Sequence, residues 1–333
     1  MSVKKLKVAL IGCGRISYKH VEAINNNKNK LKLVAACDLI NKRAQEKGVP
    51  VFEDYRDVLK EDIDIVTIAT DSGSHAKIAL AALNEGKHVI VEKPMALSSD
   101  DADKMIKAAT NNKVKLSISH QNRFNPTVQK LREAVEKKRF GKLIAGNARI
   151  LWNRGKNYYE QASWRGTYAQ DGGCLMNQCI HNIDLLQWMM GSKVEKVNAM
   201  IGNFTHSYIE AEDYGSLQLR FKNGAIGNIE GTVSVYATNL KETLMIMGED
   251  GIVELGGQAV NEILTWRFKD NRDSLEEVQL AANQSIDNVY GFGHTLLYKD
   301  MIEAIEEGRE PYINGESGKI AMKIILDAYE VCL

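Results

Sequence analysis

The segment Trp164–Trp188 carries three polar side chains at a spacing that suits proton transfer. Asn177, His181 and Asp184 follow one another at intervals of four and three residues. In a helix this spacing places all three on one face, beside apolar neighbours. A neutral imidazole on a rigid helix, next to an amide and a carboxylate, can accept a proton from a substrate. The alternative is a core histidine that bonds only to its helical neighbours, and the segment alone leaves both interpretations open.

Strand and helix patterns alternate over the first third of the chain. Nearly continuous apolar runs predict strands at 7–11, 31–37, 64–69, 88–91 and 115–119. Amphipathic patterns between them predict helices, notably over 74–85 and 98–111. This alternation is typical of a doubly wound parallel sheet covered by helices on both faces. The sequence therefore predicts an α/β Rossmann domain over residues 1–123, with ligands at the carboxyl ends of its strands.

The first predicted strand leads into a glycine-rich turn. Gly12-x-Gly14-x-x-Ser17 directly follows the strand and opens a helix, which is the context that a dinucleotide-binding turn requires. The first glycine permits the tight turn, the second lets the backbone approach a pyrophosphate, and the helix N-terminus favours its charge. Asp38 ends the second strand, where a carboxylate accepts hydrogen bonds from an adenosine ribose and repels a 2′-phosphate. NAD is therefore predicted over NADP.

A lysine is placed at the end of a central strand by the sequence Glu92-Lys93-Pro94. Proline stops the strand because it cannot donate to the ladder. Lys93 would then lie at the sheet edge that faces the nicotinamide, where partial desolvation lowers a lysine pKa enough for acid–base chemistry. The alternative is a solvated lysine with Glu92 as its ion-pair partner.

From about residue 141 the pattern changes to shorter-period alternation. Strands are predicted at 143–152, 194–201, 214–221, 225–233, 243–248 and 251–256. A helix over 172–190, opened by Gly172 and Gly173, is inserted before the second of them. This predicts an α+β domain over residues 124–333 with an open-faced, mostly antiparallel sheet. Two further helices, at about 292–307 and 316–331, are expected to pack back on the first domain.

Composition limits the classes of function. A chain of 333 residues exceeds what one hydrophobic core usually supports, which agrees with two domains. The 43 Lys and Arg residues balance the 43 Asp and Glu residues, so neither nucleic acid nor an anionic membrane is an expected partner. Five cysteines without a CxxC pair predict neither a disulfide framework nor a metal site. We expect a soluble cytoplasmic protein.

The order of these motifs resembles the glucose–fructose oxidoreductase/inositol dehydrogenase/MocA (Gfo/Idh/MocA) family over essentially the whole chain. The resemblance implies that Lys93 and His181 are catalytic and that the Rossmann domain holds a nicotinamide cofactor. The usual family pattern has aspartate four residues before the histidine. Here that position is Asn177, so no carboxylate can act there as a base or as an orienting group.

Further motifs narrow the resemblance. They are the segments 120–126, 158–159, 164–167, 176–178, 257–261 and 289–294. Together these resemble the bacterial UDP-N-acetylglucosaminuronate 3-dehydrogenases. The resemblance implies NAD-dependent oxidation of the C3 hydroxyl of a UDP-linked N-acetylamino sugar acid to the 3-keto sugar, in surface-polysaccharide (O-antigen, lipopolysaccharide) biosynthesis. It also implies 2-oxoglutarate as a candidate electron acceptor and a homodimer or homotetramer.

From the motifs and the resemblance together we expect two sets of site residues. The cofactor-binding set is Gly12, Gly14, Arg15, Ile16, Asp38, Thr70, Ser72, His75, Glu92, Lys93, Gln121, Trp164 and Arg165. The substrate-binding set is Arg123, Arg154, Tyr158, Tyr159, Asn177, Gln178, His181 and Asp184.

Within these sets several roles stay open. His181 is favoured as the proton acceptor and Lys93 as the hydrogen-bond partner of the hydroxyl, although the reverse assignment also fits. A guanidinium fork suits a uronate carboxylate or a pyrophosphate, and by resemblance Arg165 contacts the dinucleotide instead. Tyr158, Tyr159 and Trp164 either stack on uracil or pack beneath the loop.

Three other functions are compatible with parts of the sequence. One is a different enzyme of the same family, acting on UDP-N-acetylglucosamine, an inositol or a free sugar. A second is an NAD(H)-binding sensor without catalysis, against which Lys93 and His181 argue. A third is a transcriptional regulator with a Rossmann core, which the balanced charge and the lack of a basic recognition helix make a poor match.

Overall fold

The computed structural model describes residues 5–285, 291 and 293–332. The chain divides into two compact units. The first consists of Met1–Gln121 and His294–Lys319, and the second of Asn122–Gly293 and Ile320–Leu333. Each unit is therefore assembled from two separate stretches of the sequence. Residues 289, 290 and 292 of the motif at 289–294 lie outside the described residues.

The first unit is built on a six-stranded parallel sheet in the order β3-β2-β1-β4-β5-β6. Its strands are β1 (Leu6–Ile11), β2 (Leu31–Cys37), β3 (Val51–Phe52), β4 (Ile65–Ile68), β5 (His88–Val91) and β6 (Leu116–Ile118). All four residues of β4 are buried, as expected for a strand covered on both faces. The strand order reverses at β1, which is the switch point where ligands of such sheets bind. The predicted doubly wound Rossmann sheet is confirmed.

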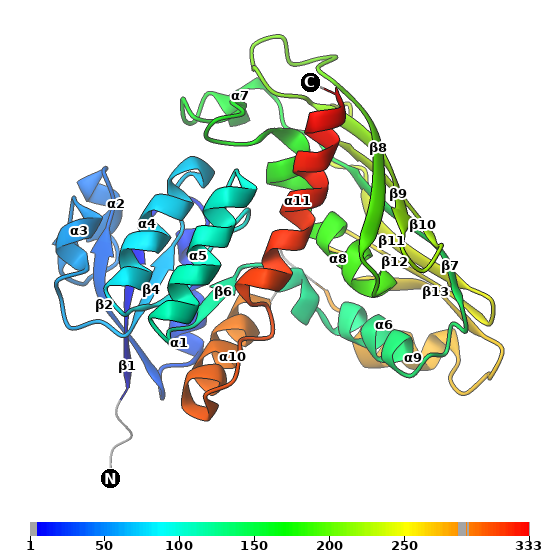
Figure 1. The fold of residues 1–333 in the computed structure, drawn as a ribbon, viewed down its shortest axis with the longest axis horizontal. Helices are drawn as coiled ribbons and strands as arrows, with labels where there is room; N and C mark the ends of the chain where they lie inside the picture. Colours follow the sequence, from blue (N-terminus) through cyan, green and yellow to red (C-terminus); the bar gives the residue numbers. More distant parts are fainter. Residues whose placement is uncertain (1–4, 286–290, 292, 333) are drawn as a thin grey trace. The chain divides into compact units, whose positions relative to one another are not determined.

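The first unit contains several helices, some of which are capped at their first turn by an aspartate or serine side chain. They are α1 (Ser17–Asn26), α2 (Asn41–Gln45), α3 (Tyr55–Val58), α4 (Ser72–Asn84), α5 (Ser99–Asn111) and α10 (Gly293–Glu307), several of them labelled in Figure 1. Asp71 accepts a hydrogen bond from Ser74 N at the start of α4 (3.0 Å). Ser98 caps α5 in the same way through Asp101 N (3.1 Å). These caps satisfy amides that the helix itself leaves without partners.

The last helix, α11 (Gly315–Cys332), contributes to both units. Near its start, a Cβ on Gly318 would lie 2.4 Å from Ile118 Cγ1, so only glycine permits this approach to β6. Near its end, Tyr329 donates hydrogen bonds to Glu212 Oε1 (2.8 Å) and to the Gly172 carbonyl (2.5 Å). The sequence predicted that both C-terminal helices pack on the first domain. The structure differs for α11, because its residues from Ile320 onward cluster with the second unit.

The second unit is built on a seven-stranded sheet in the order β13-β12-β11-β7-β10-β9-β8. Its strands are β7 (Leu143–Leu151), β8 (Val194–Gly202), β9 (Tyr214–Phe221), β10 (Ile226–Thr232), β11 (Lys241–Gly248), β12 (Gly251–Gly256) and β13 (Glu262–Phe268). Neighbouring strands are antiparallel except β7 and β10, which run parallel. The predicted mostly antiparallel sheet is confirmed. The assignment of the two predicted domains to cofactor and to substrate stays a prediction.

The second unit also contains helices and helical turns. They are a 3₁₀ turn (Gln121–Phe124), α6 (Pro126–Glu136), α7 (Lys156–Tyr159), a π-helical turn (Leu175–Cys179), α8 (Ile180–Met190) and α9 (Leu275–Ala282). α8 lies against one face of the sheet (Figure 1), where a Cβ on Gly146 of β7 would come within 2.5 Å of Leu186 Cδ1. The sheet and α8 therefore share one core.

The predicted helix over 172–190 is not a regular α-helix. Its first part is the π-helical turn, and only the residues from Ile180 form the α-helix. The wider turn fits because the sheet beneath it has no side chains at two places. A Cβ on Gly215 would lie 2.7 Å from Leu175 Cδ1, and one on Gly231 would lie 2.5 Å from Cys179 Sγ. Turns of this kind occur frequently at functional sites.

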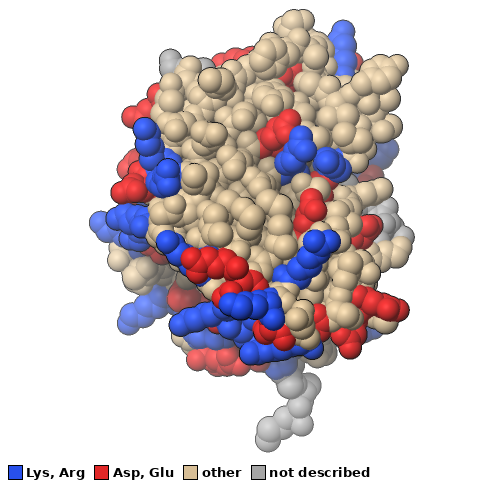
Figure 2. All heavy atoms as spheres, turned by 90° about the vertical axis from the view of Figure 1, so that its right-hand side faces the viewer, with Lys and Arg blue, Asp and Glu red and all other residues tan. Residues whose placement is uncertain are grey.

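The face of the sheet opposite α8 is open. Met200 on β8 is 81% exposed, Ile226 on β10 is also exposed, and Met245 and Met247 on β11 are half-buried. Figure 2 shows a broad uncharged area on this side, with charged side chains gathered toward its lower border. Among the described residues, none of the helices combines the length and the apolar character that crossing a bilayer requires.

Candidate active site

The glycine-rich turn of the first unit brings α1 close to the neighbouring strand end. Gly12 has φ +91°, and a Cβ there would lie 2.4 Å from the Ala69 carbonyl oxygen. Ser17 Oγ donates a hydrogen bond to the Gly14 carbonyl (2.7 Å). Ser17, the last residue of the Gly-x-Gly-x-x-Ser motif, is therefore accommodated by a hydrogen bond to the turn itself. The turn has the close backbone packing that a dinucleotide needs.

Asp38 is bound to this turn. Its Oδ2 accepts a hydrogen bond from Cys13 N (2.7 Å), and its Oδ1 accepts one from Ile40 N (2.7 Å). The half-buried carboxylate has about four lone-pair positions, so two backbone bonds orient it without exhausting its capacity. Its position after β2 fits a contact with ribose hydroxyls. Arg15 is exposed and Ile16 is half-buried beside the turn.

His75 connects the next strand end to the Glu-Lys-Pro turn. Its Nδ1 lies 2.8 Å from the Pro94 carbonyl and its Nε2 lies 3.3 Å from the Thr70 carbonyl. Burial lowers the pKa of His75, so the ring is neutral and donates from one nitrogen. Ser72, also buried, begins α4 beside it. Thr70, Ser72 and His75 thus gather at one sheet edge, and their assignment to the cofactor set stays a prediction.

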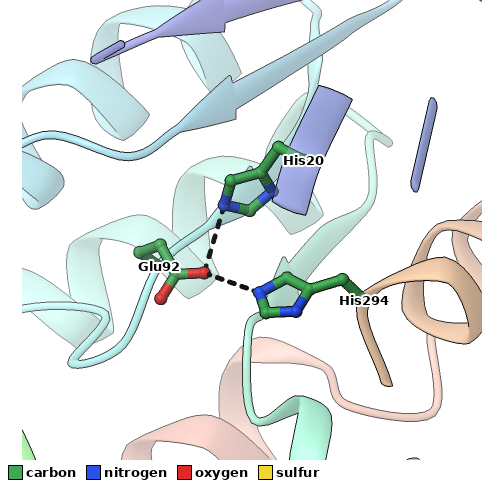
Figure 3. A group of neighbouring side chains, drawn as sticks. All are labelled: His20, Glu92 and His294. Atoms are coloured by element: carbon green, nitrogen blue, oxygen red, sulfur yellow. Dashed lines mark hydrogen bonds and ion pairs between the residues drawn. The ribbon is translucent and has the colours of Figure 1, made fainter. Parts of the chain in front are cut away.

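Glu92 is held by two histidines from distant parts of the sequence. Figure 3 shows its carboxylate between His20 of α1 and His294 of α10, with Oε1 3.2 Å from His20 Nε2 and 3.4 Å from His294 Nε2. His20 Nδ1 bonds in turn to Tyr298 OH (3.1 Å). Burial raises the Glu92 pKa, but the hydrogen bonds from the two histidines outweigh it and hold the pKa well below 4.5.

The Glu92 network was not predicted, and it bears on Lys93. Glu92 directly precedes Lys93, so a buried carboxylate held by two histidines adjoins the lysine that is expected to be catalytic. Two histidines and one carboxylate are also metal-ligand types, and their donor atoms lie within 4.8 Å of one another. The distances from Glu92 Oε1 to the two histidine nitrogens, 3.2 and 3.4 Å, place all three groups in one buried polar cluster. The prediction that the chain binds no metal stays a prediction.

In the second unit, Arg123 and Asp184 bind each other. Arg123 Nε donates to Asp184 Oδ2 (2.7 Å), Arg123 Nη2 donates to Asp184 Oδ1 (2.5 Å), and both side chains are buried. The guanidinium also lies 4.9 Å from the ring centre of Trp188. Both residues were expected to contact substrate. In the structure their charged groups form a bidentate pair, which joins the 3₁₀ turn to α8. Their contact with the substrate stays a prediction.

The π-helical turn carries a connected row of polar side chains. Asn177 Nδ2 donates to Asp171 Oδ1, and Gln178 Nε2 donates to Asn177 Oδ1 (2.5 Å) and to Tyr158 OH (3.0 Å). Arg154 Nε donates to Gln178 Oε1 (3.1 Å). His181 follows at the start of α8, half-buried. Four of the expected substrate residues are therefore linked in this row.

Two arginines stack on the aromatic side chains of this region. The Arg165 guanidinium lies 4.1 Å from the Tyr158 ring centre and 4.7 Å from that of Trp164. Arg154 lies 5.5 Å from the same tyrosine ring. Tyr159 is buried against the rings of Tyr158, His206 and Tyr208, and burial raises its pKa. Its expected contact with the substrate stays a prediction. Trp164 and Arg165 belong to the second unit, whereas the other expected cofactor residues, including buried Gln121, belong to the first.

Three acidic and basic residues near this row were missed by the sequence analysis. Asp171 is 3% exposed and binds Asn177. His206 Nε2 lies 2.8 Å from the Arg154 carbonyl, while its Nδ1 lies 2.8 Å from Asp213 Oδ2. The pKa of Asp213 is about 2, because hydrogen bonds from His206 and backbone amides outweigh burial. An aspartate directly before a glycine pair is the only local signal for Asp171, and His206 and Asp213 follow no periodicity.

Two family models match the chain. The model described as "Oxidoreductase family, NAD-binding Rossmann fold" matches residues 6–120, and that described as "GFO/IDH/MocA C-terminal domain" matches residues 128–254. The myo-inositol 2-dehydrogenase of Thermotoga maritima is 25% identical to this chain, over 95% of this chain and 93% of its own length.

Two solved structures are similar over the full length. The WlbA dehydrogenase from Bordetella pertussis, in complex with NADH and UDP-GlcNAcA, is 36% identical with a TM-score of 0.92, covering 99% of this chain and 96% of that one. The WlbA dehydrogenase from Chromobacterium violaceum, with the same two ligands, is 34% identical with a TM-score of 0.91, covering 99% and 94%. The identity, the coverage and the two family models agree that this chain belongs to the Gfo/Idh/MocA family and is an NAD-binding oxidoreductase.

Proposed function

We propose that this chain catalyses the NAD-dependent oxidation of the C3 hydroxyl of UDP-N-acetylglucosaminuronate to the 3-keto sugar. The observation that carries the proposal is the full-length similarity, at 36% identity and a TM-score of 0.92, to an enzyme solved with NADH and UDP-GlcNAcA. The row of amide and guanidinium groups in the second unit supports it, because such groups bind sugar hydroxyls, carboxylates and phosphates without a metal.

The reaction removes a proton from the substrate hydroxyl and a hydride from the same carbon. When bound, NAD supplies the acceptor for that hydride. His181 accepts the proton, because its side chain is half-buried at the start of a helix and an imidazole is a base near neutral pH. Lys93 donates a hydrogen bond to the hydroxyl and so favours its ionisation, and the Glu92 network fixes the turn from which it extends.

Arg154 and Arg165 are the cations that we assign to the acidic parts of the ligands. Arg154 belongs to the polar row through Gln178, and His206 holds its backbone carbonyl. We assign Arg154 to the uronate carboxylate or the UDP pyrophosphate, and Arg165, stacked on Tyr158, to the dinucleotide. The Arg123–Asp184 pair joins α8 to the 3₁₀ turn. We propose that this pair positions α8 and does not contact the substrate.

The setting of the reaction is part of the proposal. A 3-keto product of a UDP-linked amino-sugar acid suits the biosynthesis of surface polysaccharides such as O-antigen. All five cysteines are thiols, which suits the reducing cytoplasm. We further propose a homodimer or homotetramer that assembles through the open sheet face around Met200 and Ile226. We also propose 2-oxoglutarate as the electron acceptor that converts NADH back to NAD.

An inositol is the alternative substrate, because a myo-inositol 2-dehydrogenase is similar over 95% of this chain. The test is a substrate panel of UDP-N-acetylglucosaminuronate, UDP-N-acetylglucosamine and myo-inositol, each with NAD and with or without 2-oxoglutarate. Formation of keto product is followed by mass spectrometry, which also detects turnover when the cofactor is not released. We expect product from the UDP-linked acid. If the chain oxidised only the neutral UDP sugar, or only inositol, the uronate assignment would be rejected.

A further inference from the structure

Asp171 is a buried carboxylate that contacts two separate parts of the polar row in the second unit. Its side chain is part of a residue only 3% exposed. One oxygen, Oδ2, accepts a hydrogen bond from Gly166 N (2.7 Å), directly after Arg165. The other, Oδ1, accepts one from Asn177 Nδ2 on the π-helical turn. One side chain therefore fixes both the loop of Arg165 and the amide of Asn177.

The contacts of Asn177 determine which way its amide points. A side-chain amide has a donor end and an acceptor end of nearly equal size, so only its hydrogen bonds can orient it. A carboxylate accepts and cannot donate, so Asp171 requires the Nδ2 end. Gln178 Nε2, which donates, lies 2.5 Å from the Oδ1 end. Both neighbours favour the same orientation of the Asn177 amide. The bond to Asp171 is the stronger of the two, because its acceptor is a charged carboxylate.

We propose that Asp171 is a positioning residue that sets the donor–acceptor orientation of Asn177 and thereby the preference of the site for the substituents of the sugar. This inference rests on the proposed function and on the expectation, stated from the sequence, that Asn177 contacts the substrate. On this proposal Asp171 acts without touching either substrate or cofactor. Its effect reaches the substrate through Asn177 and through the loop that carries Arg165.

The test exchanges the two partners. Asp171→Asn removes the charge and leaves two amides facing each other, and we expect kcat/KM to fall about 10- to 100-fold, as for loss of a charged hydrogen bond, mainly through a higher KM. Asp171→Asn combined with Asn177→Asp restores a carboxylate–amide pair with reversed orientation. We expect this double variant to regain the melting temperature of the wild type while its KM stays at least about tenfold higher.

A matched control lies in the first unit. Asp300 also accepts one backbone bond, from Tyr312 N (2.7 Å), and one side-chain bond, from Arg309 Nη1 (2.8 Å). Asp300→Asn should lower the melting temperature and leave KM unchanged, because this residue lies outside the polar row.

The outcomes separate the two proposals. Turnover by the wild type tests the substrate, and the variants are then compared with whichever sugar the wild type oxidises best. The inference is wrong if Asp171→Asn keeps the wild-type KM, or if the double variant regains both the stability and the KM of the wild type. Either result would mean that Asp171 only satisfies buried hydrogen-bond donors. If Asp171→Asn does not fold, the double variant alone decides in the same way.

Discussion

Glu212 should make the stability of the second unit depend on pH. The residue is 2% exposed, and its Oε1 accepts hydrogen bonds from Leu175 N (2.8 Å) and from Tyr329 OH (2.8 Å). Burial, only partly offset by these bonds, raises its pKa from 4.5 to about 7. The folded protein therefore keeps a proton on this carboxyl at pH values where the unfolded chain has lost it.

The sign and size of the effect follow from this difference. Because the folded-state pKa is raised, the stabilising contribution of protonated Glu212 is fully present below about pH 4.5 and is lost as the pH rises to about 7. The interval from 4.5 to about 7, at about 1.36 kcal/mol for each pH unit, corresponds to roughly 3 kcal/mol of unfolding free energy.

Glu212→Gln removes this dependence, because glutamine cannot ionise and keeps an oxygen for Leu175 N and Tyr329 OH. We expect the stability difference between this variant and the wild type to widen by about 2.5 kcal/mol in favour of the variant between pH 5 and pH 8. Urea denaturation followed by tryptophan fluorescence measures it. All four tryptophans lie in the second unit, at 152, 164, 188 and 266.

The control is Glu276→Gln, which removes one exposed carboxylate of α9 and so tests the effect of net charge alone. A stability difference for Glu212→Gln that is the same at pH 5 and pH 8 would refute the reasoning, because it would mean that Glu212 ionises alike in the folded and unfolded chains.

Three further predictions concern the proposed site. Lys93→Ala and His181→Ala should each lower kcat about 100-fold or more, with NAD still bound as measured by calorimetry, since each removes one partner of the reacting hydroxyl. Equal rates for both variants and the wild type would contradict their assignment. Asp38→Ala should raise the Kd for NAD about tenfold, as expected for loss of a hydrogen-bond acceptor, and an unchanged Kd in the same calorimetric assay would count against the ribose contact. Asp184→Asn leaves Arg123 buried without a counter-charge and should lower the unfolding free energy by about 3–5 kcal/mol in urea denaturation, whereas a loss below about 1 kcal/mol would indicate that the pair is solvated.

Sequence patterns predicted the elements whose signal is local. Apolar runs located the strands of the first unit except β3, which has two residues and no measurable periodicity. The glycine turn, Asp38 and the Glu-Lys-Pro turn were predicted at strand ends, and the structure has them there. These features depend on neighbours within a few residues, and such neighbours are visible in a sequence.

The pairings within the site could not be predicted in the same way. Asn177 and His181 were assigned to one face of a regular α-helix, but the π-helical turn depends on Gly215 and Gly231, which lie on strands some 40 to 50 residues later. Arg123 was assigned to substrate because a guanidinium suits a carboxylate or a pyrophosphate, and its partner Asp184 could not be recognised because it is 61 positions away. Complementary charges far apart in a sequence carry no sign of which partner each will meet.

The Glu92 network also constrains when the first unit can fold during synthesis. His294 and Tyr298, which complete the hydrogen bonds of Glu92 and His20, emerge from the ribosome only after all of Asn122–Gly293. The hydrogen bonds of His294 and Tyr298 can therefore form only after the whole second sheet has been made. Reaching the native state of the NAD-binding unit is in this sense one of the last events of translation, although its sequence is the first to appear.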